Sequence, residues 1–587
     1  METLREILDE FDKPNNKDYT EQDVCSALEK LISKEDNLID EELKAEIMAF
    51  SFVENYKDKN TGWGTYYGPM FVWKNNDGAM IESPSINQIT PQMIDYWEKR
   101  IYETNNPILK SRYSGLVWDF KSKISGEKPS HEISRLYIKA IIDMANGDFH
   151  KYKIYTYGKL QNALNIAISL KDVVLIEQVK NTILAFEKKY SDDYKAGTWG
   201  HSFDLLIENK KINLTESEEN NIIKVLEERL FRLTHKNGDS KKIDPWSAEA
   251  SAKRLASYYR KKQKHEDVKR VILEVGKAFE KISIDAKSIQ AYGWLNHVYK
   301  LYIDFNLNKE AEELLLKMRE IGPVVSNDLK PISSTIEVPK YKIDMFIKSM
   351  TTGSSEEIIE RIIPYFIPSK EDAKEQLLEM SKKTPIIFHI PHQIQDEKGR
   401  VLATIGPLEN DIEGNVVHHI SNSLYFGGYF LREIINEAVN KKGLSKEVIL
   451  DFLSKTPIIK ADRFSTIDIA LDAYFHNDHL VYIHLIIPQI EEAIRNFIEM
   501  SGGNVLKAQK GGGFNLKTLD ELLREKIIID TLGEDFANYL RIVLTDQRGW
   551  NIRNLVCHGI IDPKMLTAQT SDRLIHIILC LGAIRYN

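Results

Sequence analysis

Apolar residues recur at three- and four-residue steps through most of this chain, which is the pattern of amphipathic helices. Residues 1 to about 55 follow it, and from Thr90 it returns and continues to about residue 320. Three segments of the second stretch resemble antiparallel helix pairs, at 162–190, 252–282 and 294–322. The last two are offset by roughly 44 residues, within the range of helical solenoid repeats. The pattern predicts a helical-repeat array that recognises a partner or forms a sensor surface, and a plain scaffold remains the alternative.

Two segments interrupt the helical pattern. Residues 56–95 are rich in glycine and aromatic residues, with Asn76-Asp77-Gly78 as a turn signal between possible short strands. We interpret this segment as an aromatic-packed insertion on a helical scaffold in preference to a substrate-binding loop. Further along, Ile386–Ile390 and Val401–Ile405 resemble a strand pair.

The C-terminal part is again helical. A helix is expected over 479–500, with an apolar stripe on one face and His484, Glu491 and Arg495 on another, and with Pro488 bending it or marking its true start. The glycine-rich residues 501–514 are expected to form a flexible linker. Shorter helices are expected at 516–524 and 534–544, followed by a last helix at 571–585 that is apolar on nearly all sides and therefore buried.

These patterns together predict an all-α protein with a small β-containing insertion. The proline- and serine-rich stretch at 322–340 is the first expected boundary. We expect a helical, repeat-like sensor or scaffold region at 1–325, a linker and mixed α/β middle region at 326–460, and a helical bundle at 461–587.

Composition limits the classes of function. The 587 residues are 42% hydrophobic and 28% charged, with a net charge of -8 and a pI near 6.1, so RNA binding would have to rest on a local site. Three cysteines cannot build a disulfide framework. The acidic N-terminus lacks the features of a signal peptide, and no apolar run approaches the eighteen residues of a membrane span. We therefore expect a cytoplasmic protein without a membrane partner.

A group of histidines invites a metal interpretation. His389, His392, His418 and His419 cluster in the sequence, but no HExxH pattern or cysteine partner accompanies them. We favour loop and strand histidines without a role over a metal site, and we expect no metal and no cofactor.

The segment Arg553-Asn554-Leu555-Val556-Cys557-His558-Gly559 carries the chemistry of the chain. A histidine with an ordinary pKa near 6.5 suits proton transfer, and a guanidinium grips phosphate oxygens in a forked geometry. On a helix Asn554 and His558 share a face, and the asparagine is suited to orient the imidazole or a ribose. Gly559 is expected to end the helix.

Two other Arg–His pairs have a similar spacing, namely Arg229 with His235 and Arg260 with His265, and we interpret both as solvated helix surface. Only the segment at 553–559 adds Asn after the Arg and Gly after the His, between apolar helices. This segment resembles the RNxxxHG motif, which defines one domain family of unassigned function within the HEPN superfamily. The run at 488–497, with Glu491 and Arg495, resembles the helix that precedes the motif in that family.

The resemblance implies a C-terminal HEPN bundle that cuts RNA without a metal. It assigns catalysis to Arg553, Asn554 and His558, with Glu491, Arg495 and His484 as possible supporting residues. In the RNA-cutting HEPN families two copies of the motif face each other, so a homodimer through the C-terminal domain is implied, with a 2',3'-cyclic phosphate and a 5'-hydroxyl as products. The alternative is a helix-end arginine and a capping histidine with only a structural role. We interpret Cys557 as small core filler.

Our hypothesis is a metal-independent endoribonuclease of a toxin or anti-phage abortive-infection type, whose helical region senses a protein or phage-derived trigger. The competing hypothesis is a non-catalytic RNA- or nucleotide-binding adaptor, in which the bundle only dimerises and the helical region binds a protein.

Overall fold

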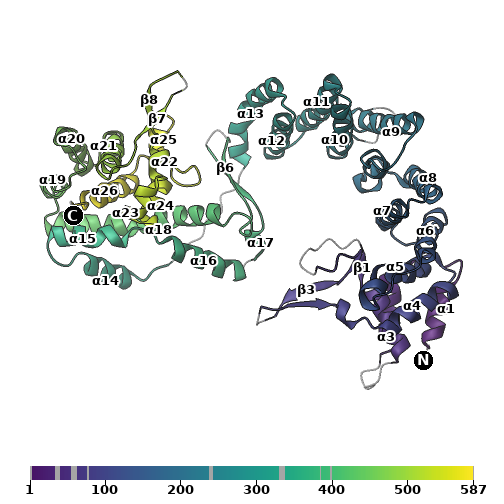
Figure 1. Ribbon diagram of the computed structural model, residues 1–587. Helices are drawn as coiled ribbons and strands as arrows, with labels where there is room; N and C mark the ends of the chain where they lie inside the picture. The colour runs from purple at the N-terminus through teal and green to yellow at the C-terminus, as the bar shows by residue number, and fades with distance from the viewer. Residues whose placement is uncertain are drawn as a thin grey trace. The chain divides into compact units, whose positions relative to one another are not determined.

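The computed structural model describes residues 3–32, 40–54, 62–75, 78–236, 242–328, 337–383, 385–396, 400–509 and 511–585. The chain divides into two compact units, unit 1 at 1–316 and unit 2 at 317–587 (Figure 1). Helices dominate both units, and the strands of the described residues form only two-stranded antiparallel sheets. The predicted all-α class is confirmed.

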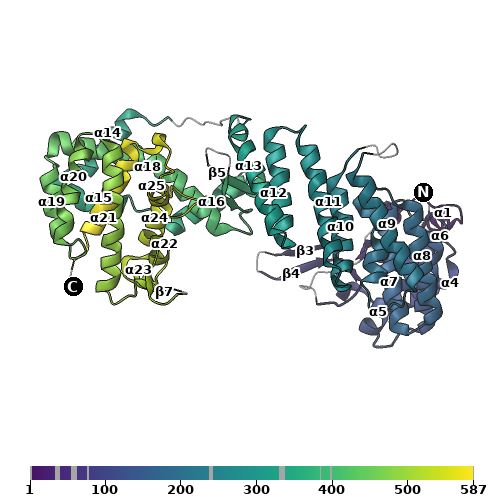
Figure 2. The same cartoon turned by 90° about the horizontal axis from the view of Figure 1, so that it is seen from above.

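Unit 1 is built from consecutive helices. They are α1 (Leu4–Asp12), α2 (Glu21–Glu29), α3 (Glu41–Ser51), α4 (Pro91–Glu103), α5 (Pro107–Ile124), α6 (His131–Asn146), α7 (Lys153–Leu170), α8 (Val173–Tyr190), α9 (Glu216–Thr234), α10 (Pro245–Lys261), α11 (His265–Ser283), α12 (Ser288–Asp304) and α13 (Asn308–Asp328), which continues past residue 316, with short turns η1 (Ile86–Gln88), η2 (Ala196–Thr198) and η3 (Phe203–Ile207). Neighbouring helices pack against each other within the run from α4 to α8, and likewise within the run from α9 to α12. Figure 2 shows α10, α11 and α12 side by side. The expected helices are present, while their repeat relationship stays a prediction.

The segment that interrupts the helices of unit 1 contains two small sheets. Strand β1 (Val53–Glu54) pairs with β2 (Tyr67–Gly68), and β3 (Phe71–Lys74) pairs with β4 (Met80–Ser83). Trp63 and Tyr67 are buried against Phe120, as an aromatic-packed insertion requires, whereas Phe71 and Trp73 on the hairpin are exposed. The expected turn residues Asn76 and Asp77 lie outside the described residues.

Unit 2 wraps its helices around one core. They are α14 (Lys340–Met350), α15 (Ser355–Tyr365), α16 (Lys370–Lys383), α17 (Pro385–Phe388), α18 (Ile412–Lys442), α19 (Lys446–Ser454), α20 (Phe464–Phe475), α21 (His479–Met500), α22 (Leu519–Leu523), α23 (Lys526–Leu532), α24 (Glu534–Leu544), α25 (Ile552–Cys557) and α26 (Ala568–Gly582), with turns η4 (Ala461–Arg463) and η5 (Pro563–Met565). Strand β5 (His392–Gln395) pairs with β6 (Val401–Ile405), and β7 (Leu506–Ala508) pairs with β8 (Phe514–Leu516).

Helix α26 lies at the centre of unit 2. Every residue from Thr570 to Gly582 is buried, and the helix packs against α15, α18, α19 and α21. The expectation of a fully buried last helix is confirmed. One cluster of buried apolar residues has members from Met350 to Leu581, so helices on both sides of residue 460 share one hydrophobic core. The division of the chain at 325 and 460 stays a prediction.

Three interpretations of local pattern are wrong. The run Ile386–Ile390 is not a strand, because Pro385 begins the short helix α17 and the strand starts only after Pro391. The glycine-rich residues around 501–514 are not a linker, since they supply strand β7 and the start of β8, with Gly512 and Gly513 at positive φ between the strands.

The third concerns Arg229, which is not on a solvated surface. Its side chain is buried, its Nε donates to Asp193 Oδ1 at 2.8 Å, and its guanidinium lies 4.5 Å from the centre of the Trp199 ring. His235, which is paired with Arg229 only by sequence spacing, is exposed, as are Arg260 and His265.

Candidate functional site

The motif Arg553–Gly559 occupies the short helix α25 and its C-terminal end. The chain turns sharply between α24 and α25, where a Cβ on Gly549 would lie 2.3 Å from the Ile542 carbonyl oxygen. At the other end His558 is the C-cap and Gly559 has a φ of 64°. The amide of Ile560 donates to the Leu555 carbonyl at 2.9 Å, which is the bond that closes a helix at a left-handed residue. The expected glycine stop is confirmed.

Arg553 is held by a carboxylate from a distant helix. Its Nε donates to Glu491 Oε2 at 2.8 Å and its Nη2 to Glu491 Oε1 at 3.3 Å, so α25 is clamped to α21 by a forked ion pair. Arg495, one turn beyond Glu491, donates its Nη2 to the same Oε1 at 2.9 Å and its Nη1 to the Lys517 carbonyl at 3.2 Å. Glu491 thus joins two arginines. We call Glu491, Arg495 and Arg553 the arginine clamp.

The charge of the arginine clamp does not cancel. Two guanidinium groups share one carboxylate, which leaves one positive charge at the edge of α25. Burial lowers the pKa of Arg553, but the hydrogen bond and the charge of Glu491 outweigh burial and leave that pKa above its ordinary value. Arg553 therefore remains a cation at every physiological pH.

Asn554 orients the arginine and not the imidazole. Its Oδ1 accepts from Arg553 Nη1 at 3.1 Å, and its Nδ2 donates to Asn551 Oδ1 at 2.7 Å and to the Thr545 carbonyl at 3.2 Å. The link between Asn554 and His558 runs through the backbone, where the His558 amide donates to the Asn554 carbonyl at 3.0 Å.

His558 is exposed at the end of α25. Cys557 is exposed as well, so its interpretation as core filler is wrong. The reason is the helical period: Ile552 is buried and Val556, four residues later, packs against the core, while Cys557 is turned off that stripe. An imidazole open to solvent thus lies five residues after Arg553, at the C-terminal end of the helix that the arginine clamp holds.

Comparison with family models, with curated proteins and with solved structures gave no match. The resemblance to the RNxxxHG family therefore rests on the motif residues alone.

No contact described for His484 links it to the arginine clamp. It is exposed, and its Nδ1 lies 2.8 Å from the Leu480 carbonyl one turn earlier in its own helix. Helix α21 continues through Pro488, so this proline does not mark its start. Of the six predicted site residues, the structure brings Glu491, Arg495, Arg553 and Asn554 into direct contact, and it leaves His558 exposed at the C-terminal end of α25.

A second group of arginines, which no sequence motif indicated, precedes the motif. Arg541 and Arg548 share Asp546, with Nη2–Oδ2 distances of 3.4 and 2.7 Å, and Asp546 directly follows Thr545, whose carbonyl binds Asn554. Here too the arginines outnumber the carboxylate. No sequence pattern signals this group, because its members become neighbours only through the turn between α24 and α25.

The four histidines of the middle region do not converge. His392 and His418 have ring centres 4.9 Å apart, whereas His419 Nε2 lies 3.0 Å from Gln376 Oε1 and His389 Nδ1 lies 3.6 Å from Glu409 Oε2. Burial lowers the pKa of both His418 and His419. Within the described ranges, no three His, Cys, Asp or Glu side chains are grouped as a metal ion requires.

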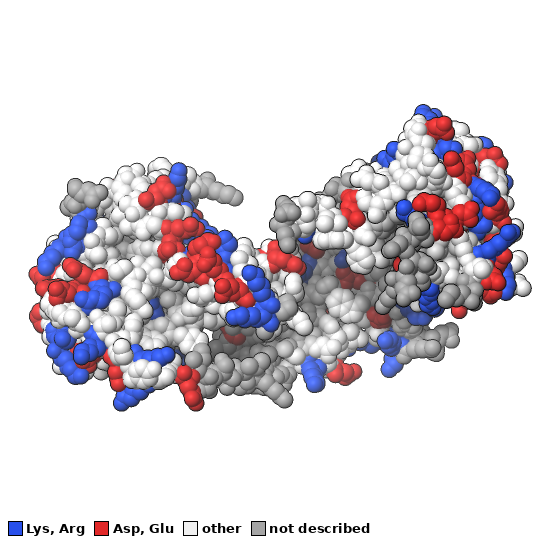
Figure 3. Space-filling view, turned by 90° about the horizontal axis from the view of Figure 1, so that it is seen from below, with Lys and Arg blue, Asp and Glu red and all other residues white. Residues whose placement is uncertain are grey.

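Two further observations concern possible partners. In the part of the chain that the structure describes, no helix has both the length and the apolar character needed to cross a bilayer. On the face shown in Figure 3, lysines and arginines are intermingled with acidic residues.

Proposed function

We propose that unit 2 is a metal-independent endoribonuclease whose reacting edge is formed by α25. One observation carries the proposal: an exposed imidazole, His558, ends the same short helix that carries Arg553, one of two arginines that share a single carboxylate. A positive charge and a proton-transfer group at one edge are what the cleavage of a ribose-phosphate link requires.

In the proposed reaction an imidazole removes the proton from a ribose 2'-hydroxyl, and the oxygen attacks the adjacent phosphorus. The bond from phosphorus to the 5'-oxygen breaks, and a second imidazole gives that oxygen a proton. The products are a 2',3'-cyclic phosphate and a 5'-hydroxyl. Arg553 stabilises the charge that builds up on the phosphoryl oxygens.

Because one chain supplies one motif histidine, the proposal includes a homodimer through unit 2, with His558 of each copy facing a shared phosphate. It also includes a trigger, a protein or phage-derived molecule bound by the helical unit 1, and a role in a toxin-like or abortive anti-phage response. These two parts rest on the resemblance and on the presence of a separate helical unit.

The test compares wild-type protein with His558→Ala and Arg553→Ala on a mixed RNA pool in excess chelator. We expect each substitution to lower the cleavage rate by about 100-fold or more, since a positioned acid or base contributes roughly 10²–10⁴-fold. The matched control is His476→Ala, which removes another exposed C-cap histidine of the same unit and should leave cleavage unchanged. Cyclic phosphate at the new 3' ends is the expected product.

One observation favours a second candidate, a non-catalytic adaptor. All three nitrogens of the Arg553 guanidinium already donate to Glu491 or Asn554, as in a purely structural clamp. If wild type and both variants bind RNA equally and none cleaves it, the adaptor is the correct function and the nuclease proposal fails.

A further inference from the structure

Unit 1 contains a cavity that no sequence pattern indicated. It has a volume of about 680 Å³ and lies among α2, β1, α5, α7 and the segment that precedes α7. That volume is within the usual range for a small-molecule site. The cavity lies wholly inside unit 1, so its shape does not depend on unit 2.

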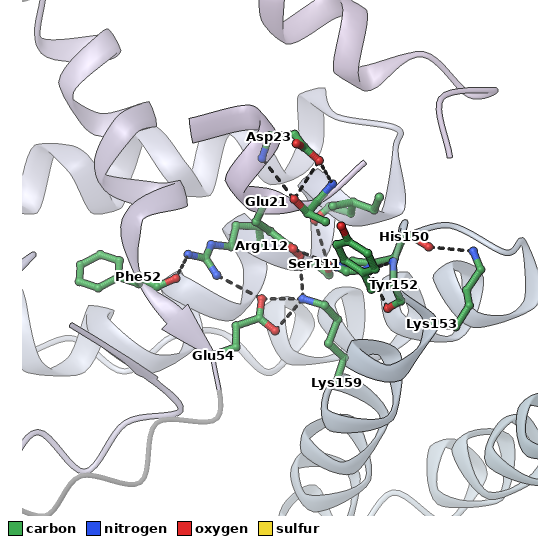
Figure 4. Close-up of polar contacts among 12 residues, drawn as sticks. Glu21, Asp23, Phe52, Glu54, Ser111, Arg112, His150, Tyr152, Lys153 and Lys159 are labelled. Atoms are coloured by element: carbon green, nitrogen blue, oxygen red, sulfur yellow. Dashed lines mark hydrogen bonds and ion pairs between the residues drawn. The ribbon is translucent and has the colours of Figure 1, made fainter. Parts of the chain in front are cut away.

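A network of buried charges forms one wall of this cavity. Lys159 Nζ donates to Glu21 Oε1 at 2.7 Å and to both oxygens of Glu54 at 2.5 and 2.6 Å, and Arg112 Nη1 donates to Glu54 Oε1 at 3.1 Å (Figure 4). The four side chains come from four different elements and balance two positive charges with two negative ones. Burying such groups costs more free energy than apolar residues of similar volume would, so the network is a poor choice for stability alone.

The carboxylates are the accessible part of the network. The side chains of Arg112 and Lys159 are 1% and 4% exposed, whereas those of Glu21 and Glu54 are 14% and 18% exposed. The Lys159 ammonium donates to Glu21 and to both oxygens of Glu54, so its three N–H groups are already in use. Burial raises the pKa of Glu21, but Lys159 and His150 outweigh burial and hold that pKa well below its usual range. A ligand entering the cavity therefore meets negatively charged oxygens.

Aromatic rings form another part of the wall. Tyr66 donates its hydroxyl to Glu54 Oε2 at 3.3 Å, and Tyr157 stacks on His201 with ring centres 3.7 Å apart. Tyr152 and Tyr155 also line the cavity and are more than half exposed. Faces of aromatic rings attract cations, as carboxylates do.

His150 shows that the wall is built in advance. Its backbone has a φ of 82°, a region that residues other than glycine rarely adopt. The buried ring is fixed between Glu21 Oε2 at 3.1 Å and the Tyr152 carbonyl at 3.0 Å from its two nitrogens. Strained backbone is typical of binding sites, and here it occurs at the residue that holds the carboxylate of Glu21.

We propose that this cavity binds a cationic group, an ammonium or guanidinium, carried on an apolar or aromatic body. The carboxylates of Glu21 and Glu54 take the cation, and Tyr66, Tyr152 and Tyr155 enclose the body. Such a ligand is either a free organic amine or a basic side chain of a peptide flanked by apolar residues. This inference does not depend on the nuclease proposal.

Calorimetric titration of the full chain tests the charge preference with matched probes. The probes are 4-phenylbutylamine, the uncharged 4-phenylbutanol and the anionic 4-phenylbutyrate, together with the capped peptides Leu-Arg-Leu and Leu-Gln-Leu. We expect the cation of at least one set to bind at least tenfold more tightly than its neutral counterpart, and phenylbutyrate not to bind. Tighter binding of the peptide identifies a protein segment as the source, and tighter binding of the amine identifies a small molecule.

A variant that fills the cavity without disturbing the network locates the binding. Gly158 lines the cavity within α7, and a Cβ there would meet no atom within 4 Å, so Gly158→Leu occupies the space and favours the helix. The matched control is Gly293→Leu, in α12 and outside the cavity, where a Cβ also meets nothing within 4 Å. We expect Gly158→Leu to weaken cation binding at least tenfold and Gly293→Leu to leave it unchanged.

Three outcomes overturn the inference: equal or tighter binding of the anion, undiminished binding by Gly158→Leu, or no binding of either cation at millimolar concentration. Because none of these measurements involves RNA, their failure is separate from failure of the nuclease proposal. Circular dichroism of each variant verifies that its helices are intact.

Discussion

The arginine clamp predicts a measurable loss of stability when its single carboxylate is neutralised. Glu491→Gln keeps the shape of the side chain but removes the charge and replaces one acceptor oxygen by an amide nitrogen. Three N–H groups then lose a charged acceptor, two of them at 2.9 Å or less. A hydrogen bond to a charged group contributes about 1.5–3 kcal/mol and a neutral one about 0.5–1.5 kcal/mol, so each short bond loses about 1 kcal/mol.

We therefore expect Glu491→Gln to lower the free energy of unfolding of unit 2 by about 2 kcal/mol. The three side chains are only 11–20% exposed, so solvent screens the clamp weakly. A chain with two units need not unfold in one step, so the suitable assay is urea-dependent hydrogen exchange, detected by mass spectrometry in peptides of α26. Glu499→Gln, at an exposed position of the same helix, is the matched control and should change stability by less than about 0.5 kcal/mol.

A double-mutant cycle with Arg553→Met separates the clamp from general effects of either change. We expect a coupling energy of about 1–2 kcal/mol between positions 491 and 553. Additive effects of the two substitutions, or a Glu491→Gln variant as stable as its control, would refute the reasoning and remove the physical link between α21 and the motif.

Two further predictions concern the two cores. Burial, with a smaller contribution from Arg573, lowers the pKa of His576 from 6.5 to about 3. As the pH falls, His576 is therefore protonated near pH 6.5 in the unfolded chain but only near pH 3 in the folded chain. Unit 2 should therefore lose up to about 1.4 kcal/mol per pH unit as the pH falls through that window, and His576→Phe should remove this part of the slope in pH-dependent urea unfolding. In unit 1, a Cβ on Gly115 would lie 2.2 Å from the hydroxyl oxygen of the buried Tyr67. Gly115→Ala should destabilise unit 1 by about 1–3 kcal/mol, and adding Tyr67→Phe should restore part of this in hydrogen exchange of α5. If the double variant is as unstable as Gly115→Ala alone, the Tyr67 hydroxyl is not the source of the clash.

Local features of the fold were predictable from the sequence because they depend on neighbouring residues. The apolar stripe of 479–500 predicts α21 with the observed ends, and Gly559 ends α25 because a residue without a Cβ adopts positive φ at no steric cost. The same local reasoning failed at Ile386–Ile390, where a β-branched run suggested a strand although Pro385 favours the first turn of a helix. It also failed at 501–514, because strands of three residues are too short to show a period.

Contacts across the fold were not predictable in this way. Glu491 and Arg553 are 62 positions apart, and only the folded arrangement of unit 2 makes them partners. The sequence placed Glu491 and Arg495 on one face of a helix, where they do form an ion pair, but it gave no sign that Arg553 joins them. The cavity of unit 1 shows the same limit more strongly. No sequence motif links the members of its charged network, which meet only when four elements come together: Glu21, Glu54, Arg112 and Lys159.

The central position of α26 has a consequence for the order in which the molecule forms during synthesis. The ribosome makes this helix after every other described helix, yet the others in unit 2 need its apolar surface to complete their packing. Unit 1 can fold while synthesis continues, whereas unit 2 can complete its fold only after residue 582 has left the exit tunnel. Until then, the two arginines and the histidine at the edge of α25 have no fixed arrangement, so any activity of that edge has to wait for α26 to pack.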